Sequence, residues 1–303
     1  SSNGVTVQVK QLAGRVMVLG DLGFWHWAWF DDKASSVDAR TSDNTFMFLW
    51  WLCLFLSTAA RAEPPYSGTI FLDPDIITSS DPTTYSGLTY TGRGNRVMFD
   101  RRVNAFVTYN AYLFNAFYSD GLQIEFQVNP EYGSVASAQV EVALYAPVIG
   151  RLPRALRANV LTGWVHRGDE AFGGGNQNLL IHTGSIAQSY IADGILEEAF
   201  VHEASHSSLD GPHAASSGWL AAQQSDAEFI STYARDNPTR EDVAETFLVY
   251  LAARCRSSRV PVAMVNTIEA TVPARLDYFE SAQLALAPVV CDWEVFRNGF
   301  ETP

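Results

Sequence analysis

The chain has 303 residues, of which 47% are hydrophobic and 17% are charged. This composition is typical of a folded protein and excludes an intrinsically disordered chain, and the length suffices for one large domain or two modest ones. The formal net charge of −13 argues against a nucleic-acid partner, because binding nucleic acid depends on Lys and Arg contacts to phosphate. An acidic surface favours solubility and does not identify a substrate.

A short apolar run begins well inside the chain. Residues 48–56 are nine consecutive apolar residues, and Ala60-Arg61-Ala62 follows them as a small-x-small cleavage pattern. The run is too short to cross a bilayer, which takes roughly 20 residues. We therefore expect a signal peptide over 47–62, a non-native upstream extension over 1–46, and a secreted or periplasmic protein with no stable membrane anchor. The alternative is a buried strand or helix at 47–57.

Residues 63–118 are predicted to form a β-rich N-terminal region. Short strands are expected at 69–72 and 96–99 and a longer one at 105–117, because these segments carry aromatic and β-branched residues. Asp120-Gly121 is a hairpin-turn signal that leads into an alternating strand at 122–128.

Residues 119–303 combine helical and strand-like patterns. The pattern at 137–146 fits either a helix or a strand, and we favour a helix that ends at Pro147. This mixture predicts an α+β domain with helices packed on a sheet. The other expected elements are a strand at 159–166, a glycine-rich loop at 172–176, a strand at 179–182 and helices at about 186–207, 240–254 and 274–284.

Two cysteines lie in the body of the chain, Cys255 and Cys291. In an exported protein they could form one disulfide, and the alternative is two buried free thiols.

The pentapeptide His202-Glu203-Ala204-Ser205-His206 matches the pattern H-E-x-x-H. On a helix, residues four apart lie on the same face, so both imidazoles can reach one Zn²⁺ ion at about 2.0–2.1 Å. Glu203 lies off this line, where its carboxylate can act as a general base on a water at the ion. The alternative is a surface helix with a fortuitous His-Glu pair.

A catalytic zinc site also needs a third protein ligand and an open fourth position. Glu241 and Glu245 are four residues apart on one face of the expected helix, so one could bind the metal while the other accepts the spare N–H of a ligating histidine. The alternative for this pair is a solvated acidic helix start, which the helix dipole favours. The full set of candidates for the third ligand is Asp210, His213, Asp226, Glu241 and Glu245.

His202-Glu203-x-x-His206, followed by Tyr233-x-Arg235-x-Asn237 and Glu241-x-x-Ala244-Glu245, resembles the catalytic domain of anthrax lethal factor and the secreted Pro-Pro endopeptidases. Both are glutamate-type zincin metallopeptidases, and the resemblance covers about 45 residues, 202–247. It implies that Glu241 is the zinc ligand, that Glu245 supports the site and that Tyr233 stabilises the tetrahedral intermediate.

The resemblance also implies a zincin-like fold over 119–303, with a mixed sheet whose edge strand pairs with an extended peptide substrate. We expect the segment 179–182 to be that edge strand, and His182 to be a cleft-lining or core residue. The leading interpretation is a secreted endopeptidase with one zinc ion. The alternative is an extracellular binding protein whose zinc site is structural or inactive, with 63–118 as its functional part.

Overall fold

The computed structural model describes residues 16–20, 24–28 and 63–293, which belong to two compact units. In the smaller unit, β1 (Val16–Gly20) and β2 (Phe24–Ala28) pair antiparallel. The expected signal peptide at 47–62 lies outside the described residues, as does most of the expected extension at 1–46. Residues 63–293 belong to the larger unit.

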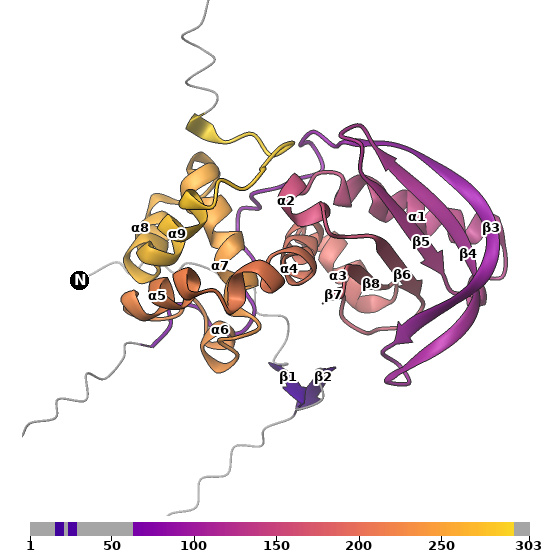
Figure 1. Cartoon of the computed structure of the whole chain (residues 1–303), viewed down its shortest axis with the longest axis horizontal. Helices are drawn as coiled ribbons and strands as arrows, with labels where there is room; N and C mark the ends of the chain where they lie inside the picture. The colour runs from indigo at the N-terminus through magenta and orange to yellow at the C-terminus, as the bar shows by residue number, and fades with distance from the viewer. Residues whose placement is uncertain (1–15, 21–23, 29–62, 294–303) are drawn as a thin grey trace, which may run out of the picture. The chain divides into compact units, whose positions relative to one another are not determined.

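A mixed sheet of six strands forms one side of this unit (Figure 1). Its strand order is β3-β4-β5-β6-β8-β7. The first three strands are antiparallel, β5, β6 and β8 run parallel, and β7 is antiparallel to β8. The strands are β3 (Tyr85–Asp100), β4 (Ala105–Tyr118), β5 (Gln123–Val128), β6 (Thr162–His166), β7 (Gly173–Gly175) and β8 (Asn178–His182).

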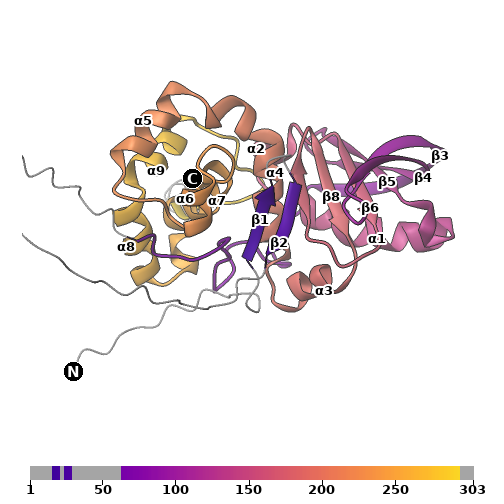
Figure 2. The same cartoon turned by 90° about the horizontal axis from the view of Figure 1, so that it is seen from below.

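Helices follow the strands in chain order and gather mainly on the other side of α4 from the sheet (Figures 1 and 2). The α-helices are α1 (Val135–Ile149), α2 (Arg154–Arg157), α3 (Ser185–Ala192), α4 (Leu196–Ser208), α5 (Ser217–Ser225), α6 (Thr232–Asp236), α7 (Asp242–Tyr250), α8 (Val262–Thr271) and α9 (Pro273–Ser281). The α+β class is therefore confirmed. Among the described residues, no helix combines the length and the apolar character needed to cross a bilayer.

One face of the sheet packs on the helices. In β4, Tyr112, Phe114 and Ala116 are buried in the main core together with residues of α1, α4, α7 and α9. The alternate residue Leu113 points to the opposite face, where it joins a small cluster with Met98 and Ala111. This alternation is the period of two expected of a strand. It fixes which face of the sheet meets α4.

Several expected elements differ from the structure. The segment 69–72 is irregular and not a strand, although Ile70 and Leu72 are buried; their backbone N–H groups donate to Glu245 and Glu198 instead of to a neighbouring strand. The helix α1 continues through Pro147 to Ile149 because its last residues pack into the core. The expected helix at 186–207 is divided at Gly194, whose φ of +79° is accessible to glycine at little cost.

The expected boundary after residue 118 falls in a hairpin of the sheet. β4 pairs with β5, the strand that follows this boundary. Residues 63–118 and 119–293 therefore belong to one unit with one main core.

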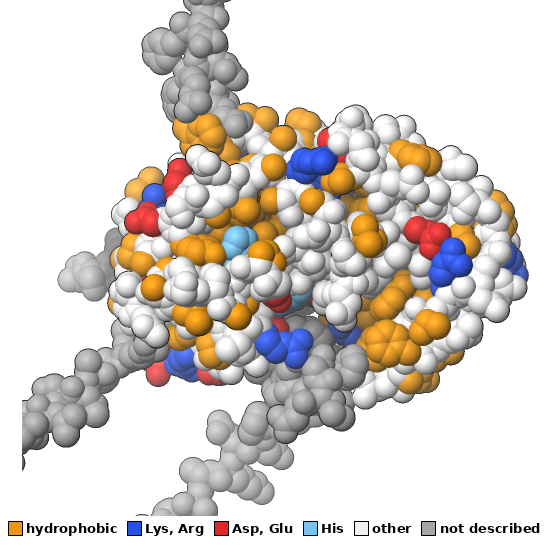
Figure 3. Space-filling view, in the orientation of Figure 1, with side chains coloured by type: hydrophobic (Ala, Val, Ile, Leu, Met, Phe, Trp, Pro, Cys, Tyr) orange, Lys and Arg blue, Asp and Glu red, His pale blue; other side chains and the backbone are white. Residues whose placement is uncertain are grey.

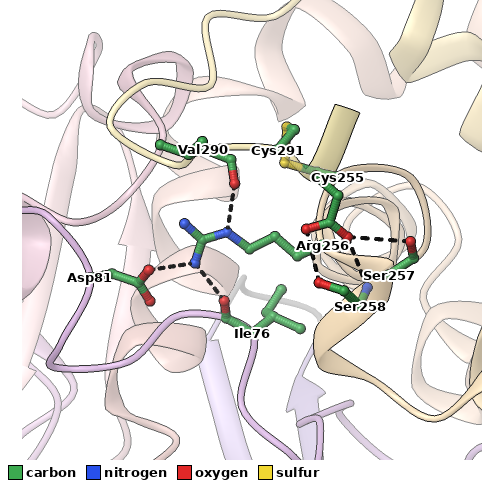
Figure 4. Close-up of a disulfide and its surroundings, with 9 residues drawn as sticks. Ile76, Asp81, Cys255, Arg256, Ser257, Ser258, Val290 and Cys291 are labelled. Atoms are coloured by element: carbon green, nitrogen blue, oxygen red, sulfur yellow. Dashed lines mark hydrogen bonds and ion pairs between the residues drawn. A yellow bond between two sulfur atoms is a disulfide. The ribbon is translucent and has the colours of Figure 1, made fainter. Parts of the chain in front are cut away.

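A disulfide joins Cys255 to Cys291 across a sequence separation of 36 residues (Figure 4). The neighbouring guanidinium of Arg256 lies 2.9 Å from Asp81 and donates to the carbonyl oxygens of Ile76 and Val290. The C-terminal segment is thus attached both to the helices and to the segment that precedes the sheet.

Candidate metal centre

The helix α4 presents both histidines of the H-E-x-x-H pattern to one point. The Nε2 atoms of His202 and His206 lie 3.1 Å apart, and the His202 side chain is almost completely buried. The opposite side of α4 packs into the core through residues such as Phe200, Val201 and Ala204. Burial of that apolar side determines which way the two imidazoles face.

Glu241 completes a group of three on the N-terminal side of α7. Its Oε2 atom lies 3.3 Å from Nε2 of His202 and 3.2 Å from Nε2 of His206. A tetrahedral ion with ligand bonds of about 2.0–2.1 Å places its ligand atoms about 3.3 Å apart. The three atoms therefore have the spacing that one Zn²⁺ ion requires, and they are the kinds of donor that zinc binds.

Each histidine has a second carboxylate on its other ring nitrogen. Glu245, one turn after Glu241, places Oε1 3.4 Å from Nδ1 of His202. Asp210 places Oδ2 2.8 Å from Nδ1 of His206. A carboxylate on Nδ1 fixes the ring and leaves Nε2 facing the centre, which is the usual arrangement around metal-binding histidines. Asp210 is thus not a third ligand. It lies four residues after His206, and this spacing lets its carboxylate contact the outer nitrogen of the His206 ring.

The buried side chains of the site shift one another's pKa values. Burial disfavours a charged imidazole, but the carboxylates of Glu241 and Glu245 outweigh it and raise the pKa of His202 to about 10. The pKa of His206 is also raised against burial, chiefly by Glu241 and Asp210. The pKa of Glu241 is well below its ordinary value, because the two imidazoles offset the cost of its burial. A cation is thus favoured at the point where these side chains meet.

Glu203 projects from α4 beside this group without joining it. Its Oε2 atom is buried and has no hydrogen-bond partner among the described residues. A buried carboxylate oxygen without a partner is costly. It is therefore available to a water or substrate group at the centre.

Tyr233 approaches from α6, where Ser231 accepts a hydrogen bond from the Ala234 N–H and so fixes the start of the helix. The Tyr233 ring is buried. Burial, followed by the charges of Glu241, Glu245 and Glu203, raises its pKa far above the ordinary value. The phenol is therefore close to the carboxylates of the site and remains protonated at neutral pH.

The other candidate ligands lie elsewhere. Asp226 forms a buried ion pair with Arg275, with an oxygen–nitrogen distance of 2.8 Å. His213 contacts the Tyr278 hydroxyl through Nδ1, at 2.7 Å. His182 is a core residue, and its ring stacks on that of His166 with centroids 5.3 Å apart.

The strand next to the centre is β7, not β8. The predicted edge strand β8 is paired on both sides, with β6 and with β7. The expected glycine-rich loop forms β7, the last strand in the sheet order, because the absence of side chains lets it pack against α4: a Cβ atom on Gly174 would lie 1.8 Å from the Glu203 carbonyl oxygen. Three successive glycines were the signal for this close approach.

Acidic and histidine side chains come to the surface together near the middle of the face seen in Figure 3.

A comparison of the chain with protein-family models, with curated proteins and with solved structures finds no match. Among the described residues, His202, His206 and Glu241 are the group with the spacing of metal ligands.

Proposed function

We propose that this protein is a zinc-dependent endopeptidase of the glutamate zincin type. The observation that carries the proposal is the spacing of three donor atoms, Nε2 of His202, Nε2 of His206 and Oε2 of Glu241, at 3.1, 3.2 and 3.3 Å from one another. Three protein ligands with an open fourth position are typical of catalytic zinc sites. Glu203 follows His202 in α4, and its Oε2 atom is buried without a hydrogen-bond partner among the described residues.

Each side chain then has a chemical task. When bound, zinc polarises the scissile carbonyl and makes water a better nucleophile at neutral pH. Glu203 takes a proton from the attacking water and passes it to the leaving nitrogen. Tyr233, whose high pKa keeps it protonated, donates a hydrogen bond to the oxygen that gains negative charge. Glu245 and Asp210 hold the two imidazoles in place.

The edge of the sheet supports a peptide as the substrate. β7 is the last strand of the sheet and packs directly on α4 at Glu203. An extended peptide that adds to such an edge gains main-chain hydrogen bonds whatever its sequence. We therefore infer that β7, and not β8, is the edge strand that pairs with an extended peptide substrate.

The disulfide supports a site of action outside the cytoplasm. Disulfides such as Cys255–Cys291 form and persist mainly in oxidising compartments. Together with the signal peptide expected at 47–62, this favours a secreted or periplasmic enzyme.

The alternative, a binding protein with a structural zinc site, would require a closed set of four ligands. Asp210 contacts the outer nitrogen of His206 and His213 contacts Tyr278. Among the described residues, only His202, His206 and Glu241 form a group with metal-ligand spacing. The geometry thus favours the enzyme.

The decisive experiment measures zinc content and peptide cleavage on the same preparations of the full chain. Glu203→Gln is expected to keep one zinc ion and lose about 10²- to 10⁴-fold in turnover, the usual contribution of a general base. Glu197→Gln is the matched control, because Glu197 lies on the same helix but pairs with Arg151, at 3.3 Å. Cleavage of a random-sequence peptide mixture is followed by mass spectrometry. Zinc-loaded protein that cleaves no peptide would refute the proposal, and near-native turnover in Glu203→Gln would refute the role of this carboxylate.

A further inference from the structure

Arg101 lies against β7, the edge strand that packs on the helix carrying His202 and His206. It is the first residue after β3, in the turn that connects β3 to β4. Its guanidinium lies against the first residue of β7: a Cβ atom on Gly173 would be 2.6 Å from Nη2 of Arg101. The next residue of β7, Gly174, is in contact with the backbone of Glu203. The side chain of Arg101 and the backbone of Glu203 thus lie against successive residues of β7, on opposite faces of that strand.

The surroundings of Arg101 are those of the site. Burial lowers the pKa of Arg101, and the charge of Glu203, followed by that of Glu170, opposes that change. Glu203 is the proposed general base. The guanidinium therefore lies within the electrostatic field of the centre.

Arg101 nevertheless forms no ion pair with another described residue. Its Nη1 atom is buried without a hydrogen-bond partner in the described part of the chain. The buried arginines of the core behave differently: Arg157 pairs with Asp120, and Arg275 pairs with Asp226 and Asp242. Arg101 as a whole is partly exposed, but a buried donor atom without an acceptor is expensive. Nη1 is thus a buried donor that lacks an acceptor among the described residues.

We propose that Arg101 binds a carboxylate of the peptide substrate, so that the enzyme prefers substrates with an acidic side chain or a free C-terminal carboxylate next to the scissile bond. This inference rests on the proposed peptidase function and adds a substrate class to it. A guanidinium has a fixed, planar set of donors that matches the two oxygens of a carboxylate. The substrate would supply the acceptor that Nη1 lacks among the described residues. The Arg101 end of β7 is then the subsite at which that group is recognised.

The test uses four versions of one peptide that the zinc-loaded full chain cleaves. The residue that faces Arg101 is either Glu or Gln, and the C-terminus is either free or amidated, so that the two sources of a carboxylate are separated. The wild-type protein is expected to cleave one carboxylate form about 10- to 100-fold more efficiently, in kcat/KM, than its neutral counterpart, as for a charge-assisted hydrogen-bonded pair. Arg101→Gln is expected to reduce the ratio of kcat/KM between the carboxylate peptide and its neutral counterpart to about 1.

Two further variants make the result specific. Arg101→Lys keeps the charge and loses the paired donors, so it should retain only part of the preference. Arg93→Gln removes the same charge from the same hairpin and is the matched control, because the Arg93 side chain lies over Tyr112 and donates to the Asn110 carbonyl oxygen. It should keep the full preference. Melting temperature and zinc content are measured for every variant, so that a folding defect is recognised.

The outcomes separate this inference from the proposed function. Cleavage that does not depend on a carboxylate in the wild type, or an equal loss on all four peptides in Arg101→Gln, would overturn the role of Arg101 and leave the peptidase intact. Absence of any cleavage by the zinc-loaded wild type would overturn the proposed function and this inference with it. A preference for only the Glu peptide or only the free C-terminus identifies the source of the carboxylate.

Discussion

Replacing Glu241 and Glu245 by alanine, one at a time, should affect zinc retention differently. Glu241→Ala removes one of the three atoms that meet at the centre and is expected to abolish stoichiometric zinc binding. Glu245→Ala removes only the carboxylate on Nδ1 of His202. Loss of such a supporting partner typically costs 10- to 100-fold in metal affinity, about 1.4–2.8 kcal/mol.

Glu245 also stabilises the fold, and its effect on the free energy of unfolding can be separated from its effect on zinc affinity. Its Oε2 accepts hydrogen bonds from the Ile70 N–H, at 3.1 Å, and from the Ser231 hydroxyl, at 2.8 Å. Each buried donor left without a partner costs about 1–3 kcal/mol, so Glu245→Ala should lower the free energy of unfolding by about 2–6 kcal/mol. In Glu245→Gln the amide oxygen can still accept from these donors, but the amide nitrogen cannot accept from His202. That variant should therefore weaken zinc binding with a smaller loss of stability.

Competition between the protein and a chelator of known affinity gives the zinc dissociation constants, and urea unfolding of the metal-free proteins gives the stabilities. Retention of zinc by Glu241→Ala together with its loss from Glu245→Ala would show that the two roles are reversed. Wild-type zinc affinity in Glu245→Gln would show that the contact with His202 does not support the metal.

Two further predictions concern stability. Gly174→Ala places a Cβ atom 1.8 Å from the Glu203 carbonyl oxygen and should lower the free energy of unfolding by about 1–3 kcal/mol or more, measured by urea unfolding. Gly87→Ala is the control: its added Cβ meets open space, so its free energy of unfolding should stay close to that of the wild type. Burial lowers the pKa of both His166 and His182 to about 4, so the unfolded chain binds more protons than the native protein between pH 4 and 6.5, and stability should fall as the pH drops through this range. At pH 5, each imidazole lowers the free energy of unfolding by about 2 kcal/mol relative to neutral pH. A His182→Gln protein whose urea midpoint depends on pH as steeply as that of the wild type would contradict this prediction.

Local sequence patterns predicted most elements of the described region because those elements follow local rules. The aromatic and β-branched residues of β4 alternate with the period of a strand, and α4 and α7 are amphipathic or apolar over several turns. Elements were missed where distant contacts replaced local pairing. Residues 69–72 lack a strand partner because the buried carboxylates of Glu198 and Glu245 take their N–H groups. The glycines of β7 form a strand because they pair with β8, and the absence of a side chain at Gly174 lets α4 lie against it.

The sequence by itself determined the two histidines and the helix that carries them, since i and i+4 spacing is a property of the helix alone. It also limited the third ligand to a few acidic residues and His213. Only the tertiary structure decided between them, because the packing of α7 on α4 brings Glu241, 35 residues after His206, within 3.2 Å of its ring. The same holds for Arg101: no local pattern marks it, and the long hairpin of β3 and β4 alone places its charge beside Glu203. Helical spacing is encoded over four residues, whereas a counter-ion or a subsite depends on which surfaces the whole chain buries together.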